Sequence, residues 1–210
     1  AQEWNKKAQT IIWFANSSKS IGIISLSDQI KQNSKEAIQK LQKEGIAVYM
    51  LTGDNLTNAK IISEKTGISY YKAEMLPEDK TNFVKKLQDD GKIVAMVGDG
   101  INDSIALAQS DVGIAMGKGS DIAIDVAKIT IVSSDLLKIV ESIKLSKATV
   151  LTIKQNLFWA FIYNIIGIPI AAGILYPING FLLNPMIAGA AMAFSSVSVV
   201  MNSLLLKWKK

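Results

Sequence analysis

Two short segments carry the residue types that phosphate chemistry requires. Thr52, Gly53 and Asp54 directly follow an apolar run that ends at Leu51, so a hydroxyl and a flexible backbone amide lie at the start of a predicted helix, where anions bind. Residues 98–103, Gly-Asp-Gly-Ile-Asn-Asp, follow a second apolar run and present two carboxylates and an amide from one turn. Oxygen ligands of this kind suit Mg²⁺, which takes one or two carboxylates and completes its coordination with water and phosphate.

A third candidate is Lys80, which ends the sequence Leu-Pro-Glu-Asp-Lys near a third strand end. Its ammonium group could neutralise a phosphoryl group there. Taken singly, each feature has a simpler interpretation, because Thr-Gly-Asp-Asn and Gly-Asp-Gly are common turns and a lone Lys is usually a solvated surface charge. The three features in this order, each at the end of a strand, are far more specific than any one of them.

An alternation of strands and helices positions these segments. Short runs that are apolar or β-branched throughout predict buried parallel strands at residues 20–26, 47–51, 92–97, 112–116 and 129–132. Helical periodicity, with Gly or Pro at the ends, predicts helices at 34–43, 56–66 and 77–90. This order indicates an α/β fold with a doubly wound parallel sheet, in which ligands bind at the carboxyl ends of the strands.

The composition excludes several classes of function. The 210 residues include 23 Lys and no Arg, and the formal charge of +5 arises near the C-terminus, where six Lys and no acid follow Glu141. Because Arg is the residue that grips phosphates and guanine in a bidentate way, the chain is a poor nucleic-acid binder. The lack of Cys and His excludes disulfides, the usual zinc sites, thiol nucleophiles and His catalysis. Any chemistry must therefore use carboxylates, Lys, hydroxyls, amides or Met.

The C-terminal third has the character of a membrane hairpin. Between Gln155 and Leu206 no residue carries a formal charge, and a Tyr-Pro-Ile-Asn-Gly turn divides this stretch. Residues 156–176 and 186–206 would each form a helix about 31 Å long, enough to cross a hydrocarbon core of about 30 Å. Lys residues flank both outer ends and none lies in the turn, so the positive-inside rule predicts both ends in the cytoplasm. A buried helical hairpin in a soluble protein is the alternative.

The two predicted spans contain an uncharged set of soft and polar ligands. Met192 and Ser196 are four residues apart and share a helical face, and Tyr163 and Asn164 lie in the neighbouring span. Sulfur favours Cu(I), whereas Ca²⁺, Mg²⁺ and Zn²⁺ would require carboxylate or imidazole ligands, which the spans lack. Simple packing is the alternative, because Ala, Gly and Ser form a small-residue surface around Met192 and Met is a common apolar filler.

Several of these motifs together resemble a known family. Residues 50–55 (Met-Leu-Thr-Gly-Asp-Asn), 73–80, 96–107 and 108–117 look like the phosphorylation domain of P-type ATPases, which has a haloacid dehalogenase-like fold. Tyr-Asn at 163–164 and Met-x-x-x-Ser at 192–196 are similar to the last two membrane helices of the copper-exporting heavy-metal members. The resemblance extends from about Ile21 to the C-terminus.

The resemblance implies a role for each candidate residue. Thr52, Gly53 and Asn102, with Asp54 beside them, would contact the phosphoryl group, and Lys80 would stabilise its charge. Asp99 with Asp103 would organise Mg²⁺. The intramembrane ligands of Cu⁺, and of Ag⁺ if it too is carried, would be Tyr163, Asn164, Met192 and Ser196. The cofactors implied are Mg²⁺ and ATP, with the nucleotide pocket mostly outside this chain.

Two features of the family are absent from the sequence, and one residue differs. P-type chemistry requires a nucleophilic Asp in an Asp-Lys-Thr-Gly motif, which does not occur in the 210 residues. A Cys-Pro-Cys motif that would complete the copper site is also absent, so the metal site here is half a site. Ile105 stands where the family usually has Pro. The chain alone is therefore expected to be inactive.

The resulting interpretation is the C-terminal portion of a Cu⁺-exporting P-type ATPase. Residues 1–15 would be the tail of a nucleotide-binding domain, 16–135 the phosphorylation domain, 136–155 an amphipathic linker helix and 156–210 the transmembrane hairpin. Residues 1–155 would be cytoplasmic and the hairpin would lie in the lipid bilayer, in the cell membrane, with the N-terminal parts of the same pump as partners. The alternative is a non-catalytic truncated paralogue that acts as a membrane subunit or regulator of a complete pump.

Overall fold

The computed structural model of the chain describes residues 10–17, 19–26, 29–117, 121–180 and 184–207. Residues 1–9 of the predicted nucleotide-binding tail and 181–183 of the predicted inter-span turn lie outside these ranges. The chain divides into two compact units, Ala1–Val140 and Glu141–Lys210.

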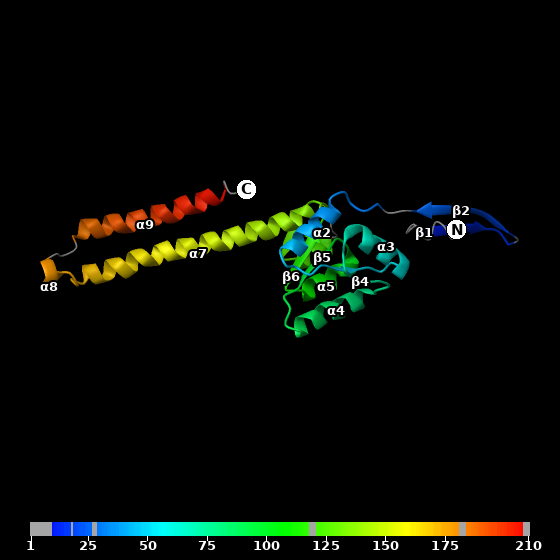
Figure 1. Ribbon diagram of the computed structural model, residues 1–210, viewed down its shortest axis with the longest axis horizontal. Coiled ribbons are helices and arrows are strands. Elements are labelled where there is room, and N and C mark those ends of the chain that lie inside the picture. Colours follow the sequence, from blue (N-terminus) through cyan, green and yellow to red (C-terminus); the bar gives the residue numbers. More distant parts are fainter. Residues whose placement is uncertain (1–9, 18, 27–28, 118–120, 181–183, 208–210) are drawn as a thin grey trace. The chain divides into compact units, whose positions relative to one another are not determined.

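The first unit contains four of the five predicted parallel strands, divided between two sheets. Strand β3 (Tyr49–Leu51) pairs in parallel with β4 (Tyr70–Lys72). A second sheet has the order β5-β6-β7, formed in parallel by Ala95–Gly98, Val112–Met116 and Ile129–Ile131 (Figure 1). The α/β class and the parallel pairing are confirmed. Strand β4 was not predicted, because three residues with two Tyr are too short to give a periodic signal.

The prediction that residues 20–26 belong to the parallel sheet is wrong. These residues do form strand β2 (Ser20–Leu26), but it pairs antiparallel with β1 (Thr10–Ala15), from Thr10 opposite Leu26 to Phe14 opposite Gly22. The connection is a tight turn in which the Asn16 side chain accepts a hydrogen bond from the Lys19 N–H at 2.8 Å. Two neighbouring β-branched runs joined by so short a turn pair with each other, because local contacts cost the least chain entropy.

The predicted helices of this unit are present almost residue for residue. They are α2 (Ser34–Lys43), α3 (Leu56–Thr66) and α4 (Pro77–Asp89), and two short helices follow, α5 (Ser104–Gln109) and α6 (Asp121–Val126). Helix α3 ends at Gly67, whose φ of +79° is accessible to glycine at no steric cost. Helix α4 begins with Pro77, and its Asp79 carboxylate accepts the Leu76 N–H at 2.9 Å.

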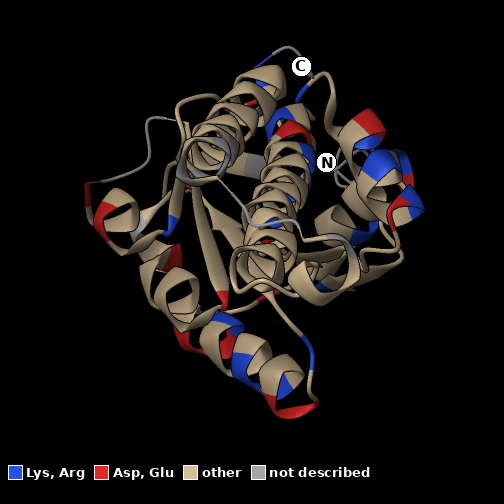
Figure 2. Cartoon of the chain, turned by 90° about the vertical axis from the view of Figure 1, so that its left-hand side faces the viewer, with Lys and Arg blue, Asp and Glu red and all other residues tan. Residues whose placement is uncertain are grey.

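An apolar core fixes the ends of the strands that carry the candidate site. It joins α4, α5, α6, β5 and β6 through buried side chains, namely Val84, Met96, Ala106, Leu107, Ala115 and Ala123. Helix α5 packs directly on β6, because a Cβ at Gly113 would lie only 2.7 Å from the Leu107 carbonyl oxygen. The charged positions of this unit lie mostly on its helices and loops, outside this core (Figure 2). The loop between β5 and α5 is therefore held at both ends.

A carboxylate ties two helix starts together in this unit. Asp135 Oδ1 accepts the Leu137 N–H at 3.0 Å, at the start of helix α7 (Leu137–Ala171). Asp135 Oδ2 accepts a hydrogen bond from Asn33, just before α2, at 3.2 Å. The Leu137 N–H, with a smaller contribution from Asn33, lowers the pKa of the Asp135 carboxyl below its usual value, and partial burial opposes them. The folded state therefore favours the ionised form of the Asp135 carboxyl more than the unfolded state does.

Asp135→Asn should therefore destabilise the protein at neutral pH but not in acid. Because the folded pKa lies below the unfolded one, the stabilisation is present above the unfolded pKa of about 3.9 and is lost as the pH falls through the folded pKa. Urea unfolding of the full chain at pH 7 and pH 3 measures the difference, with Asp125→Asn on exposed α6 as the control. An equal deficit at both pH values would contradict this role.

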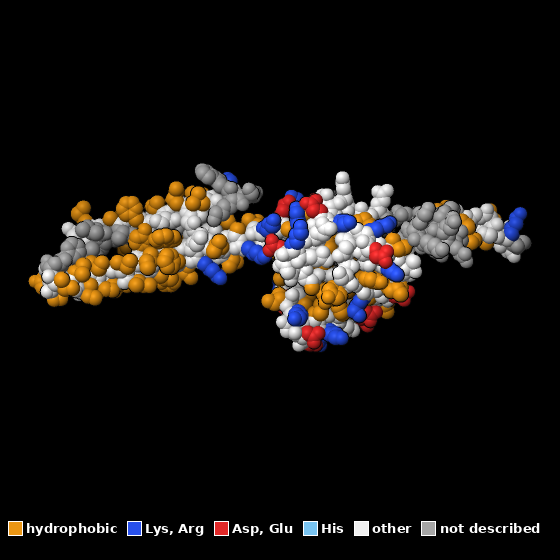
Figure 3. Space-filling view, viewed as in Figure 1, with side chains coloured by type: hydrophobic (Ala, Val, Ile, Leu, Met, Phe, Trp, Pro, Cys, Tyr) orange, Lys and Arg blue, Asp and Glu red, His pale blue; other side chains and the backbone are white. Residues whose placement is uncertain are grey.

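The second unit is a pair of long helices. The predicted linker helix and first span form one continuous helix, α7 (Leu137–Ala171), which contains Pro169. A short helix, α8 (Tyr176–Asn179), precedes α9 (Pro185–Leu206), where Asn184 caps the start by accepting the Met186 N–H at 2.8 Å. Exposed hydrophobic side chains occur along both α7 and α9 (Figure 3).

Within the described ranges, none of the helices meets the combined length and hydropathy that a membrane crossing demands. The transmembrane hairpin at 156–210 stays a prediction.

Candidate functional site

The loop after β3 is held by the segment that follows β4. The Thr52 N–H donates to the Lys72 carbonyl at 3.0 Å, and the Thr52 carbonyl accepts the Met75 N–H at 3.0 Å. The Glu74 N–H donates to the Asp54 carbonyl at 2.8 Å, and the Asp54 N–H donates to Thr52 Oγ1 at 3.1 Å. The loop is thus fixed while Gly53 and Asp54 remain exposed. Asn55 caps the start of α3 by accepting the Asn58 N–H at 2.9 Å, and the exposed Gly53 and Asp54 lie directly before it.

Glu74, in the segment that holds this loop, has a strained backbone. Its φ is +56°, in the left-handed region that residues other than Gly seldom adopt. Sequence reasoning missed it, since no pattern of residue types marks a Glu for this conformation. The strain is offset by the hydrogen bond from the Glu74 N–H to Asp54, which couples Glu74 to the candidate phosphate loop.

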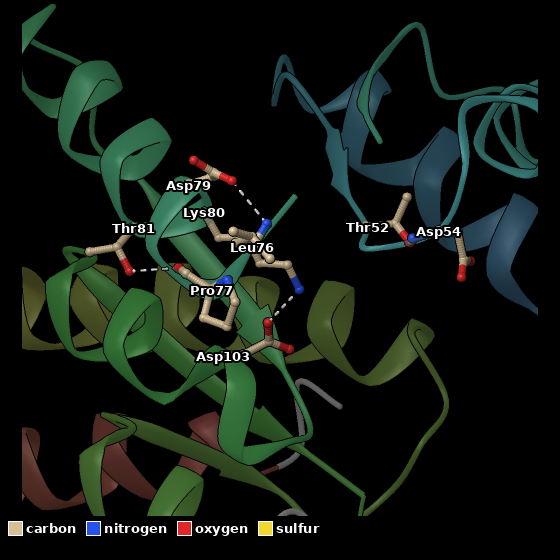
Figure 4. Close-up of polar contacts among 8 residues, drawn as sticks. All are labelled: Thr52, Asp54, Leu76, Pro77, Asp79, Lys80, Thr81 and Asp103. Carbon is tan, nitrogen blue, oxygen red and sulfur yellow. Dashed lines mark hydrogen bonds and ion pairs between the residues drawn. The ribbon is translucent and has the colours of Figure 1, made fainter. Parts of the chain in front are cut away.

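Lys80 and Asp103 form an ion pair, although their predicted partners were a phosphoryl group and Mg²⁺. Lys80 Nζ lies 2.8 Å from Asp103 Oδ1, and the two side chains are 14% and 17% exposed. Lys80 comes from the first turn of α4 and Asp103 from the end of a 3₁₀ turn, Ile101–Asp103, and the two side chains point toward one another (Figure 4). The pair joins the second and third motifs into one cluster.

The ion pair depends on a glycine at the end of β5. A Cβ at Gly98 would lie 2.7 Å from Asp103 Cβ and 2.9 Å from Asp103 Oδ2, closer than side chains approach each other. Gly98→Ala should displace Asp103 and cost about 1–3 kcal/mol in the free energy of unfolding. Gly22→Ala is the matched control, because a Cβ there meets nothing within 4 Å. Equal urea-unfolding curves for the two variants would contradict this packing.

The other polar residues of the 98–103 segment are accessible. Asp99 and Asn102 are exposed, and Asp103 is half-buried. The described residues contain no group of three or more acidic side chains placed to hold a metal. Two carboxylates and an amide oxygen from one loop nevertheless fit Mg²⁺, which takes its other ligands from water and phosphate. Ile105 is exposed in α5, and the turn before it closes with a 3.2 Å hydrogen bond from the Asp103 N–H to the Gly100 carbonyl.

The site is divided between the two parallel sheets. Thr52 and Asp54 follow β3, whereas the Lys80–Asp103 pair lies beside the end of β5, and Figure 4 shows the two groups apart. Among the described strands, β3 pairs only with β4 and β5 only with β6. Strands β3 and β5 therefore each have one edge without a partner among the described strands. A candidate motif follows the carboxyl end of each of these two strands.

A pocket of about 540 Å³ lies next to the Thr52 loop. Its wall includes the basic residues Lys72 and Lys86 and the acidic residues Glu74 and Asp79. Because charges of both signs line the pocket, they do not indicate that its ligand is an anion. Lys72 Nζ lies 5.0 Å from the centre of the Phe83 ring, a cation–π contact.

The four predicted copper ligands lie on the two helices of the second unit. The Asn164 amide donates to the Ala160 carbonyl at 3.0 Å, and the Ser196 hydroxyl donates to the Met192 carbonyl at 3.3 Å. Both groups therefore bond to their own helix. Tyr163 is half-buried, whereas Met192 is 69% exposed, so its sulfur is accessible.

Comparisons with known proteins identify the family of the chain. A profile of the haloacid dehalogenase-like hydrolases matches residues 1–111. The probable copper-transporting ATPase PacS of Synechocystis sp. is 55% identical over 207 residues, which cover 99% of this chain and 28% of that protein. The probable copper-importing P-type ATPase A of Enterococcus hirae is 53% identical over 211 residues, or 100% of this chain and 28% of that protein.

A solved structure supports the same relationship. A zinc-transporting PIB-type ATPase in the E2.Pi state superposes with a TM-score of 0.81 at 33% identity, over 98% of this chain and 32% of that chain. This chain therefore spans less than a third of the length of the relatives that it matches. It belongs to the haloacid dehalogenase-like hydrolase family, and within it to the relatives of the copper-transporting P-type ATPases.

Proposed function

We propose that the chain acts as the C-terminal portion of an ATP-driven Cu⁺ export pump. In this role it supplies the loops that handle Mg²⁺ and phosphate, and half of an intramembrane copper site. The observation that carries the proposal is the cluster formed by Lys80, Asp103 and the loop after β5. The Thr52 loop follows β3, a strand that, like β5, has one edge without a partner among the described strands. The relatives named for copper transport supply the ion.

Each residue of the cytoplasmic site would make a specific contribution. Because Thr52 Oγ1 accepts the Asp54 N–H, the Thr52 hydroxyl hydrogen can point to a phosphoryl oxygen, and the Gly53 amide adds a second donor. Asn102 would hold another phosphoryl oxygen, and Lys80 would supply a positive charge. Asp99 and Asp103 would hold Mg²⁺, which when bound neutralises phosphoryl charge. Until then the ion pair with Lys80 holds the Asp103 side chain in its orientation.

The nucleophile would come from outside the 210 residues. A strand inserted between β3 and β5 would pair with both unpaired edges and bring a carboxylate between the two motif-bearing loops. The Asp carboxylate of an Asp-Lys-Thr-Gly segment at the end of such a strand would attack the terminal phosphoryl group of ATP, break its bond to the β-phosphate oxygen and form an aspartyl phosphate, with ADP as the leaving group.

The ion site would lie between α7 and α9. Met192 offers sulfur and is accessible to a third helix, while Tyr163, Asn164 and Ser196 add oxygen ligands without formal charge. A divalent ion would lose more hydration energy than this set restores, whereas a soft monovalent ion, Cu⁺ or Ag⁺, loses less and gains more from sulfur. Ligands from an earlier helix would complete the site.

The membrane assignment makes a prediction of its own. In a hairpin with both ends in the cytoplasm, Lys144 and Ile178 lie on opposite sides of the bilayer, and both are exposed, Ile178 at 80%. Because the chain has no native Cys, single variants Lys144→Cys and Ile178→Cys can be labelled one at a time with an impermeant thiol reagent. Labelling of both from the same side would reject the hairpin and the placement of residues 1–155 in the cytoplasm.

The fragment interpretation is tested by completing the chain. In a chimaera, this chain replaces the matching segment of PacS, to which it is 55% identical. The isolated chain with labelled ATP should form no acid-stable phosphoenzyme, because it lacks the nucleophile, whereas the PacS chimaera should form one. A phosphoenzyme on the isolated chain would refute the proposal. A chimaera that stays unlabelled beside an active PacS would favour the alternative, a non-catalytic paralogue that serves as a membrane subunit or regulator.

A further inference from the structure

Polar side chains join the two long helices of the second unit near one end. Asn156 Nδ2 donates to Ser203 Oγ at 2.8 Å, and Asn202 Nδ2 donates to Asn156 Oδ1 at 2.8 Å. Asn202 Nδ2 also lies 3.4 Å from Gln155 Oε1. Asn156 therefore donates to one residue of α9 and accepts from its neighbour. These four residues, Gln155, Asn156, Asn202 and Ser203, are called the amide cluster below.

The amide cluster specifies the register of two antiparallel helices. Figure 1 shows α7 and α9 running side by side in opposite directions, joined through α8. In an antiparallel pair, one can start from two residues that lie opposite each other and count the same number of residues toward the C-terminus on one helix and toward the N-terminus on the other. The two residues reached in this way also lie opposite each other. Because Asn156 lies opposite Ser203, four residues on from Asn156 place Ala160 opposite Val199. Both are half-buried, as facing positions should be.

One further step reaches the predicted copper ligands. Seven residues, or about two helical turns, lead from Asn156 to Tyr163 on the same face of α7, and seven residues back from Ser203 lead to Ser196 on the same face of α9. Tyr163 and Ser196 are thus in register across the helix pair. Asn164 and Ser196 bond to their own helices and so do not set this register themselves.

We infer that the amide cluster is a register lock that positions Tyr163 opposite Ser196. Its members are positioning residues, and the inference rests on the proposed copper site only for its functional consequence. A shift by one helical turn would separate Asn156 from Ser203 and from Asn202, so the hydrogen bonds between the two helices favour this one register. Apolar side chains elsewhere on α7 and α9 would tolerate such a shift.

Crosslinking measures the register without copper. The chain has no native Cys, so Ala160→Cys with Val199→Cys gives one in-register thiol pair and Ala160→Cys with Ser195→Cys gives a pair shifted by one turn. A short thiol-to-thiol reagent should favour the in-register pair in the full chain. Asn156→Leu with Asn202→Leu should lower this preference about tenfold. The control is Ser198→Ala, whose hydroxyl bonds only to the Phe194 carbonyl of its own helix at 2.8 Å among its described contacts.

Exchanging the side chains of Asn156 and Ser203 distinguishes an effect on the helix register from a general loss of stability. Asn156→Ser with Ser203→Asn keeps an amide opposite a hydroxyl and should restore the preference to within about twofold of the unchanged chain. In the PacS chimaera without added Cys, the Leu variants should weaken Cu⁺ binding about tenfold and the exchange should restore it. An unchanged preference in the Leu variants, or unchanged Cu⁺ binding once the preference is lost, would overturn the inference. A chimaera that binds no Cu⁺ but keeps the preference would overturn the copper site and leave the register lock in place.

Discussion

Asp99→Asn in the PacS chimaera is expected to lower phosphoenzyme formation from ATP about a hundredfold. Asp99 is exposed at the end of β5, four residues before the half-buried Asp103, so it is the carboxylate of this loop most accessible to Mg²⁺. An amide keeps the shape and a ligand oxygen but removes the charge that holds the ion. The measurement is the amount of acid-stable label at a fixed, limiting Mg²⁺ concentration.

The control for this substitution is Asp125→Asn, which removes one exposed carboxylate near the end of α6. It should leave phosphoenzyme formation unchanged. A partial rescue of Asp99→Asn by high Mg²⁺ would support the ligand role, since a weakened site refills by mass action. Full activity of Asp99→Asn at limiting Mg²⁺ would remove Asp99 from the site.

Met192→Ala should produce the second large effect, a loss of about tenfold or more in Cu⁺ stimulation of ATP hydrolysis by the PacS chimaera. The substitution removes the sulfur, and Met192 is 69% exposed, so the loss of packing within this chain is small. Ser195→Ala, on another face of α9, is the matched control and should be nearly silent. If Met192→Ala left the stimulation intact, helix packing would be the better interpretation of these residues.

The sequence predicted the helices of the first unit more accurately than its sheets. Helices α2 and α3 have the predicted bounds because their limits depend on local signals, such as Gly67 after α3. Strand pairing depends on which segments meet in space. Strand β2 was assigned to the parallel sheet but pairs with β1, and the parallel strands divide into two sheets where a strand between β3 and β5 would join them.

The candidate site shows the same limit. The rule that ligands gather at the carboxyl ends of parallel strands placed Thr52 and Asp99 correctly at the ends of β3 and β5. The ion pair between Lys80 and Asp103 could not be predicted, because it joins side chains 23 residues apart whose meeting depends on the packing of α4. The left-handed conformation of Glu74 and the amide cluster are likewise properties of the folded chain.

ATP-driven metal uptake into inside-out membrane vesicles that contain the PacS chimaera is the most direct test of the central claim. It requires the phosphate site and the ion site of this chain to work together, and uptake into such vesicles corresponds to export from the cell. The account predicts ATP-dependent uptake of Cu⁺, little uptake of Zn²⁺, and loss of Cu⁺ uptake in Asp99→Asn and Met192→Ala. Equal uptake of Zn²⁺, or Cu⁺ uptake that persists in both variants, would contradict it.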